Sequence, residues 1–180
     1  MRRTAVILFF AFLLVGAPAF AASLRVPHSS DTLNIPAASM LRFRAFDQDG
    51  TAKFDGPIKL SGAWYYGGNP IDDGTANDSS LYFVPDRESA ARLPSFKERG
   101  QPSAVYITNA SAFLKGIVPE SARAALARTP GKYLSGKIDI WVDEFEAGIE
   151  CDAPFFNARF LRVAEPPLRV ALADLPDVGC

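Results

Sequence analysis

The stretch "YLSGKIDIWVDEF", Tyr133 to Phe145, is the clearest strand in the sequence and decides the fold class. Its apolar residues share one face and its polar residues, with one tryptophan, share the other: Leu134, Ile138, Ile140 and Val142 against Lys137, Asp139, Trp141 and Asp143. A period of two residues is typical of a strand with one buried side. A second long strand, "FFNARFLRV" (residues 155–163), follows. The C-terminal half therefore predicts a β-rich domain.

Upstream of this stretch, further strands and short helices are predicted. Strands are expected at "MLRFRAF" (40–46), "IKLSGAWYYG" (58–67), "SLYFV" (80–84) and "SAVYIT" (103–108). Gly62 predicts a bulge where a barrel strand bends. Short helices are expected at "DRESAARL" (86–93), "NASAFLKGI" (109–117) and "PESARAALAR" (119–128). Apart from the helix at 86–93, the order from Ile58 is strand, strand, strand, helix, strand, strand.

This order of elements predicts a small barrel. A helix between the third and fourth of five strands is the connectivity of the OB-fold, a Greek-key barrel. We therefore predict a mainly β protein with short helices (α+β), built as an OB-like barrel. A twisted antiparallel sheet with helices on one face is the alternative, and periodicity does not separate the two.

Three segments carry a family resemblance. "GKYLSGKIDIWV" (131–142) followed by "FFNARFLRV" resembles the closing strands of small exported OB-like domains of unknown function, and "IKLSGAWYY" (58–66) resembles their first strand. The resemblance covers about residues 56–164 and implies an OB-like barrel. It implies no catalytic residue, because such domains have no established activity. Residues 86–130 form a longer connection than a minimal barrel has.

The N-terminal sequence predicts export. Arg2 and Arg3 precede an apolar run, and "AFA" (19–21) has the small residues that signal peptidase requires. We predict a signal peptide over residues 1–21, an irregular N-terminal arm over 22–39 and a single β-barrel-like domain over 40–180. The protein is expected in the periplasm or secreted, without stable membrane insertion after cleavage. A retained anchor is the alternative, but the apolar run is short for a bilayer.

The sequence contains two cysteines, Cys151 and Cys180. An oxidising compartment favours a disulfide between them. That bond would close a loop of about 30 residues and stabilise the fold by about 3.6 kcal/mol on the loop-entropy account. Two free thiols, or a bond from Cys180 to another chain, are the alternatives.

Charge and histidine content exclude several functions. Removing the predicted signal peptide takes away two of the 19 basic residues and none of the 20 acidic ones, which leaves a net charge of about −3. This balance, without a basic block, argues against nucleic acid and anionic membranes as partners. The single histidine, His28, lies in the predicted arm, a poor position for a nucleophile system or a zinc site. No cofactor is predicted.

A loop rich in Asp, Asn and Gly lies between "WYYGG" and "SLYFV". Its oxygen atoms could form an irregular calcium site, with these candidate ligands: Asp72, Asp73, Asn77 and Asp78. No EF-hand register fits, because the sixth and twelfth positions lack the required Gly and Glu. The same residue types suit an exposed turn, which is the favoured interpretation.

The remaining candidates are acids and aromatic residues. "DEFEAGIECD" (143–152) concentrates carboxylates that could hydrolyse a glycoside as a pair. The aromatic residues Trp64, Tyr66, Tyr82 and Trp141 could form a platform for sugar rings or a peptide, although a core position is the alternative for each. We predict a non-catalytic binding or accessory domain, whose partner is an envelope glycan or an exported protein. An envelope polysaccharide hydrolase and a calcium-stabilised structural module are the alternatives.

Overall fold

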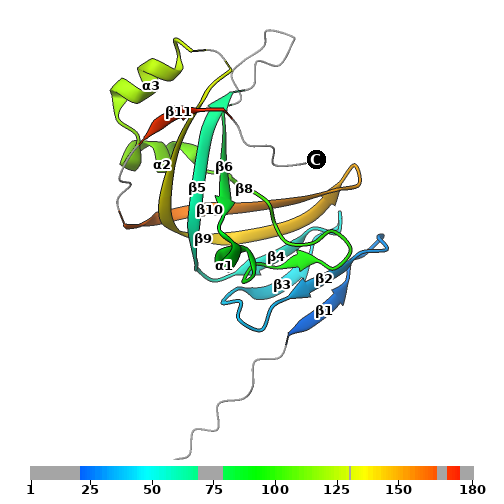
Figure 1. Ribbon diagram of the computed structural model, residues 1–180. Coiled ribbons are helices and arrows are strands. Elements are labelled where there is room, and N and C mark those ends of the chain that lie inside the picture. Colours follow the sequence, from blue (N-terminus) through cyan, green and yellow to red (C-terminus); the bar gives the residue numbers. More distant parts are fainter. Residues whose placement is uncertain (1–20, 69–78, 130, 166–169, 175–180) are drawn as a thin grey trace, which may run out of the picture.

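A computed structural model describes residues 21–68, 79–129, 131–165 and 170–174 (Figure 1). Strands take up 53% and helices 14% of these described residues, so the prediction of a mainly β protein with short helices is confirmed. The predicted elements from Ile58 onward are present: β5 (Ile58–Gly68), β6 (Ser79–Pro85), α1 (Arg87–Ala90), β8 (Val105–Ile107), α2 (Ala110–Ile117), α3 (Glu120–Leu126), β9 (Tyr133–Glu150) and β10 (Ala153–Glu165).

The strands form one large mixed sheet and a smaller one. Within the large sheet the pairings β5–β6, β6–β8, β8–β10, β10–β9 and β9–β5 run in a closed circuit. β8 and β10 are parallel, and the other four pairs of the circuit are antiparallel. The sheet therefore differs from the predicted antiparallel alternative in this pair. Parallel neighbours need a long crossover, which here contains α2, α3 and β9.

β9 holds the large sheet together because it pairs along both edges. One edge pairs with β5 over residues 134–142 and then with β4 (Ala52–Asp55) at 146–147. The other edge pairs with β11 (Ala171–Ala173) and then with β10. Glu144, with a φ of 47°, lies on β9 between the segment that pairs with β5 and the segment that pairs with β4. The strand β3 (Arg42–Phe46) extends the sheet beyond β4.

The segment 22–39, predicted to be irregular, instead contains two strands. β1 (Ala22–Arg25) and β2 (Thr32–Ile35) form a hairpin, and β2 also pairs with β7 (Ser95–Phe96). Val26 and Leu33 are buried in the main core. The prediction failed because each strand has only four residues, too few for a clear period of two among the polar residues. This small sheet lies at the opposite end of the molecule from α2 and α3 (Figure 1).

Aromatic rings fill both ends of one continuous core. At the helical end, the ring of Phe113 on α2 meets Trp64 at 5.2 Å and Phe160 at 5.3 Å between centroids, both edge to face. At the other end, Phe156 stacks with Phe145 and lies 6.1 Å from Phe96 of the small sheet. The helix α2 and the small sheet therefore each cover one end of this core.

Gly62 does not mark a bulge, because the registers of β5 with β6 and with β9 run through it without a shift. The residue is small for another reason. A Cβ atom at this position would lie 2.2 Å from the carbonyl oxygen of Val84. Glycine here permits the close approach of two backbones.

No helix among the described residues is long and apolar enough to cross a membrane. The predicted signal peptide, apart from its last residue, lies outside the described part of the chain.

Candidate functional site

A row of three tyrosines crosses β5, β6 and β8 on the outer side of the sheet. Tyr65 lies opposite Tyr82, and Tyr82 lies opposite Tyr106. The rings of Tyr82 and Tyr106 meet edge to face, with centroids 5.9 Å apart and planes inclined by 64°. Since neighbouring strands are about 4.8 Å apart, the row covers about 10 Å across the strands. We call these three residues the tyrosine face.

Alternation along each strand turns these tyrosines outward. Their neighbours on both sides are buried or packed against the core: Trp64, Tyr66, Leu81, Phe83, Val105 and Ile107. Because successive side chains point to opposite faces of a sheet, the tyrosines must lie on the outer side. Tyr65 and Tyr82 are half-buried, and Tyr106 is 38% exposed. The face is therefore accessible and held in place by its strands.

A fourth tyrosine supports one edge of the tyrosine face. The ring of Tyr133 packs over Gly67, where a Cβ atom would lie 2.7 Å from Cδ1 of the ring. Burial, and secondly the nearby Tyr82, raise the pKa of the Tyr133 hydroxyl, so it stays protonated at neutral pH. Ser80 lies opposite Gly67, and Ser135 lies opposite Tyr65. The residues bordering the face here are uncharged and rich in hydroxyl groups.

The structure separates the four aromatic residues that were predicted to form one platform. Trp64 is fully buried beneath Phe113 of α2, so it belongs to the core and not to an exposed surface. Tyr66 is half-buried and packs against the same core. Trp141 lies on the outer side of β9, with the guanidinium of Arg162 5.2 Å from its ring centroid.

Of the predicted aromatic residues, Tyr82 alone lies on the tyrosine face. Sequence reasoning missed Tyr65 and Tyr106. A signal for them was present, because each tyrosine of the face follows a buried apolar residue in "WYY", "LYF" or "VYI". In all three cases the tyrosine falls on the opposite face from that neighbour.

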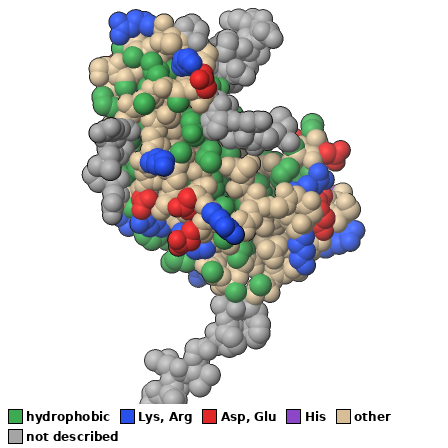
Figure 2. All heavy atoms as spheres, viewed as in Figure 1, with side chains coloured by type: hydrophobic (Ala, Val, Ile, Leu, Met, Phe, Trp, Pro, Cys, Tyr) green, Lys and Arg blue, Asp and Glu red, His purple; other side chains and the backbone are tan. Residues whose placement is uncertain are grey.

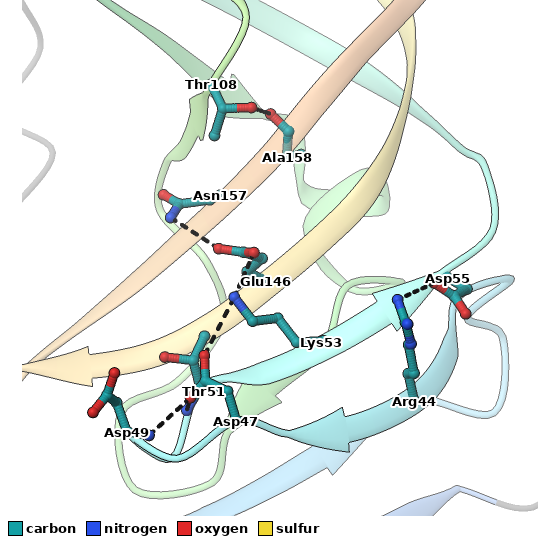
Figure 3. A network of polar contacts seen from close by, with 10 residues as sticks. All are labelled: Arg44, Asp47, Asp49, Thr51, Lys53, Asp55, Thr108, Glu146, Asn157 and Ala158. Atoms are coloured by element: carbon teal, nitrogen blue, oxygen red, sulfur yellow. Dashed lines mark hydrogen bonds and ion pairs between the residues drawn. The ribbon is translucent and has the colours of Figure 1, made fainter.

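The acids at the end of β9 are mostly held by basic residues. Figure 3 shows the Lys53 ammonium between Glu146, at 2.6 Å, and Asp47, at 3.4 Å. Burial disfavours the charged form of Lys53, but the contacts with Glu146 and Asp47 together outweigh this, and the pKa of Lys53 is raised. Asn157 also donates to Glu146, at 3.5 Å. Lys53, Asp47 and Glu146 line an open pocket of about 430 Å³, together with residues that include Phe46.

Asp143 and Glu144 both pair with the guanidinium of Arg159, at 2.8 and 2.9 Å. A glycosidase needs two carboxyl groups across a cleft, one of which stays protonated until it donates. Asp143, Glu144 and Glu146 instead each form an ion pair with a basic residue. Glu150 and Asp152 are exposed. This arrangement does not favour the hydrolase alternative.

The four candidate calcium ligands, Asp72, Asp73, Asn77 and Asp78, lie outside the described residues. Among the residues that are described, no group of three or more His, Cys, Asp or Glu is arranged to hold a metal ion. A second Asp-rich turn, "DQDG" at residues 47–50, has a structural role. Oδ1 of Asp47 accepts hydrogen bonds from the backbone N–H groups of Asp49 and Thr51, at 3.1 and 2.9 Å.

Cys151 and Asp152 form the two-residue turn between β9 and β10. Their φ angles of 48° and 63° match the turn type that suits a tight hairpin. The Cys151 side chain is exposed and has no disulfide partner among the described residues. Cys180 lies outside them, so the disulfide between the two stays a prediction.

The lone histidine and Cys151 line the same polar pocket, of about 490 Å³, which the sequence did not predict. Arg99 crosses this pocket: its Nε lies 3.0 Å from Oδ1 of the buried Asp31, and one Nη donates to the carbonyl oxygen of Asp152 at 2.7 Å. No hydrogen bond joins His28 to Cys151. In this pocket Arg99 therefore has a structural role, because it connects Asp31 to the turn between β9 and β10.

Comparison of this chain with protein-family models, with curated proteins and with solved structures finds no match.

Proposed function

We propose that this protein is an exported, non-catalytic binding domain whose tyrosine face takes a glycan of the cell envelope. The observation that carries the proposal is the row of Tyr65, Tyr82 and Tyr106 on the outer side of three adjacent strands. Aromatic rings offer apolar surface for the C–H faces of sugars, and their hydroxyl groups offer hydrogen bonds. The serines and the small side chains beside the row suit a polyhydroxyl ligand.

The fold we propose is an OB-type barrel. Its support is the order of the circuit, β5-β6-β8-β10-β9, with a parallel third and fifth strand and helices between the third and fourth. OB-folds bind oligonucleotides and oligosaccharides on the face of their second and third strands. Those strands correspond to β6 and β8, which carry Tyr82 and Tyr106. The mild acidity of the chain favours the sugar over the nucleic acid.

Export is supported from two sides. The N-terminal sequence has the features of a signal peptide, and β1 begins at Ala22, directly after the predicted cleavage site. Cleavage there would leave the β1–β2 hairpin intact. On the face shown in Figure 2, side chains of both charge signs are spread out, which suits a protein that does not rely on an anionic membrane or nucleic acid.

The test is to measure, by isothermal calorimetry, the binding of the purified protein to envelope glycan fragments. The double variant Tyr82→Ala, Tyr106→Ala should weaken binding by at least about tenfold, a loss of about 1.4 kcal/mol. Trp141→Ala is the matched control, since Trp141 is an outer aromatic residue away from the row. The proposal fails if no fragment binds, or if Trp141→Ala abolishes binding while the double variant retains it.

A further inference from the structure

A single ammonium group borders the tyrosine face. Lys137 lies on the outer side of β9, directly opposite Ala63 of β5. Ala63 is two residues from Tyr65 on the same face, so Lys137 is the diagonal neighbour of Tyr65. Diagonal neighbours in an antiparallel pair lie about 7–8 Å apart at Cα, within reach of a lysine side chain. The ammonium group can therefore reach a ligand that stacks on Tyr65.

The charge of Lys137 is exposed, and none of the described side chains forms an ion pair with it. The nearest acid on its own strand face is Asp139, whose carboxylate lies 2.6 Å from Nζ of Lys59. The bond from Lys59 holds the pKa of Asp139 below its ordinary value, so this carboxylate is ionised and already has a basic partner.

The surface between Lys137 and the tyrosines is low and uncharged. In the register of the three strands, Ala63 lies between Lys137 and Val84. The side chains of Ala63 and Val84 are both apolar. A sugar ring seated on Tyr65 and Tyr82 would therefore have a substituent directed along this shallow strip toward the ammonium group. Among the described residues that form the tyrosine face and this strip, Lys137 alone is basic.

We propose that the tyrosine face recognises a glycan with a carboxylate on the sugar that stacks at Tyr65, and that Lys137 binds this carboxylate. The inference rests on the proposed glycan-binding function. One ammonium group matches one singly charged carboxylate. Phosphate and dense sulfate are better met by arginine forks or clusters of bases, and neither is present here.

The test compares two probes that differ in one group. One is a peptide-free oligosaccharide of alternating N-acetylglucosamine and N-acetylmuramic acid, which carries a lactyl carboxylate on every second sugar. The other is the same oligosaccharide with each carboxylate converted to its methyl ester. The acidic probe should bind about threefold to tenfold more tightly, and this preference should weaken as salt is added.

Lys137→Gln should remove the preference and Lys137→Arg should keep it, because arginine retains the charge. Lys115→Gln, an exposed lysine of α2, is the matched control and should change neither affinity.

Equal binding of the two probes, with both lost in the tyrosine double variant, would overturn the role of the carboxylate and leave glycan binding in place. A preference that survives Lys137→Gln would overturn the role of Lys137. If neither probe binds, the proposed function falls with the inference.

Discussion

The side-chain amide of Asn109 exchanges two hydrogen bonds with the backbone of Phe160. Nδ2 donates to the carbonyl oxygen at 2.9 Å, and the N–H of Phe160 donates to Oδ1 at 2.8 Å. Asn109 precedes α2 but makes no side-chain capping bond to that helix. Its amide instead fixes the start of α2 to β10, directly beside the contact between Phe113 and Phe160.

Asn109→Ala should lower the free energy of unfolding by about 2 kcal/mol, because it leaves two partly buried backbone groups without partners. Asn109→Asp should also destabilise, since a carboxylate cannot donate to the carbonyl oxygen of Phe160. Urea unfolding followed by tryptophan fluorescence measures both. Asn157→Ala is the control: its 3.5 Å bond to Glu146 should contribute less than about 1 kcal/mol. Equal losses for Asn109 and Asn157 would contradict this account.

Two glycines should respond in opposite directions to replacement by alanine. Gly62→Ala places a Cβ atom 2.2 Å from the carbonyl oxygen of Val84, so β5 and β6 must move apart. We expect a loss of about 1–3 kcal/mol. Gly116→Ala lies in α2 with nothing within 4 Å of the new atom, and should stabilise by about 0.5–1 kcal/mol. Thermal melts of the two variants give the comparison, and a stabilised Gly62→Ala variant would sink the close-approach argument.

The carboxyl of Asp31 should make stability depend on pH in the acidic range. The hydrogen bond from Arg99, and secondly that from Ser29, hold the pKa of Asp31 below its ordinary value of 3.8. A group with a lowered pKa in the folded state stabilises the fold above its ordinary pKa. That contribution is lost as the pH falls through the folded-state value.

Asp31→Asn should therefore have a lower free energy of unfolding than the parent at neutral pH. The difference between the two free energies should narrow below a pH of about 4. Urea unfolding of both proteins at a series of pH values measures the gap. Asp49→Asn, at an exposed carboxyl in the neighbouring turn, serves as the control and should track the parent throughout. A gap for Asp31→Asn that is constant with pH would rule out this role.

The predicted bond between Cys151 and Cys180 is open to chemical test. The protein purified under oxidising conditions should show no reactive thiol before reduction and should run as a monomer without reductant. Cys151→Ser should then lower the free energy of unfolding by about 2–4 kcal/mol. Two reactive thiols in the native protein would exclude the bond, and a reducible dimer that persists in Cys151→Ser would show that Cys180 pairs between chains.

The elements from residue 58 onward could be predicted because each has a clear period or a clear cap. The strand predicted at 58–67 is observed as β5 at Ile58–Gly68, and the side chain of Asp86 accepts from the N–H of Ser89 at the start of α1, as its cap position indicates. The strands β1 and β2 could not be predicted, since each has only four residues and the pairing of β2 with β7 depends on a contact distant in the sequence.

The candidate site was predicted less well than the fold, for a physical reason. Alternation along β5 places Trp64 and Tyr65 on opposite faces, but the sequence does not say which face is inside. Phe113 decides this, because it comes from α2 and covers Trp64. The register then places Tyr82 and Tyr106 beside Tyr65, and cross-strand register is not encoded within any one strand.

The position of β9 in the chain sets the order in which the fold can assemble. β4 and β5 are synthesised early, yet both need β9, whose residues begin at Tyr133, to complete their pairing. Contacts between such distant segments form slowly, because a long loop must close first. If the chain is exported unfolded, as we propose, this delay assists export, because β4 and β5 cannot complete their pairing before β9 has been synthesised.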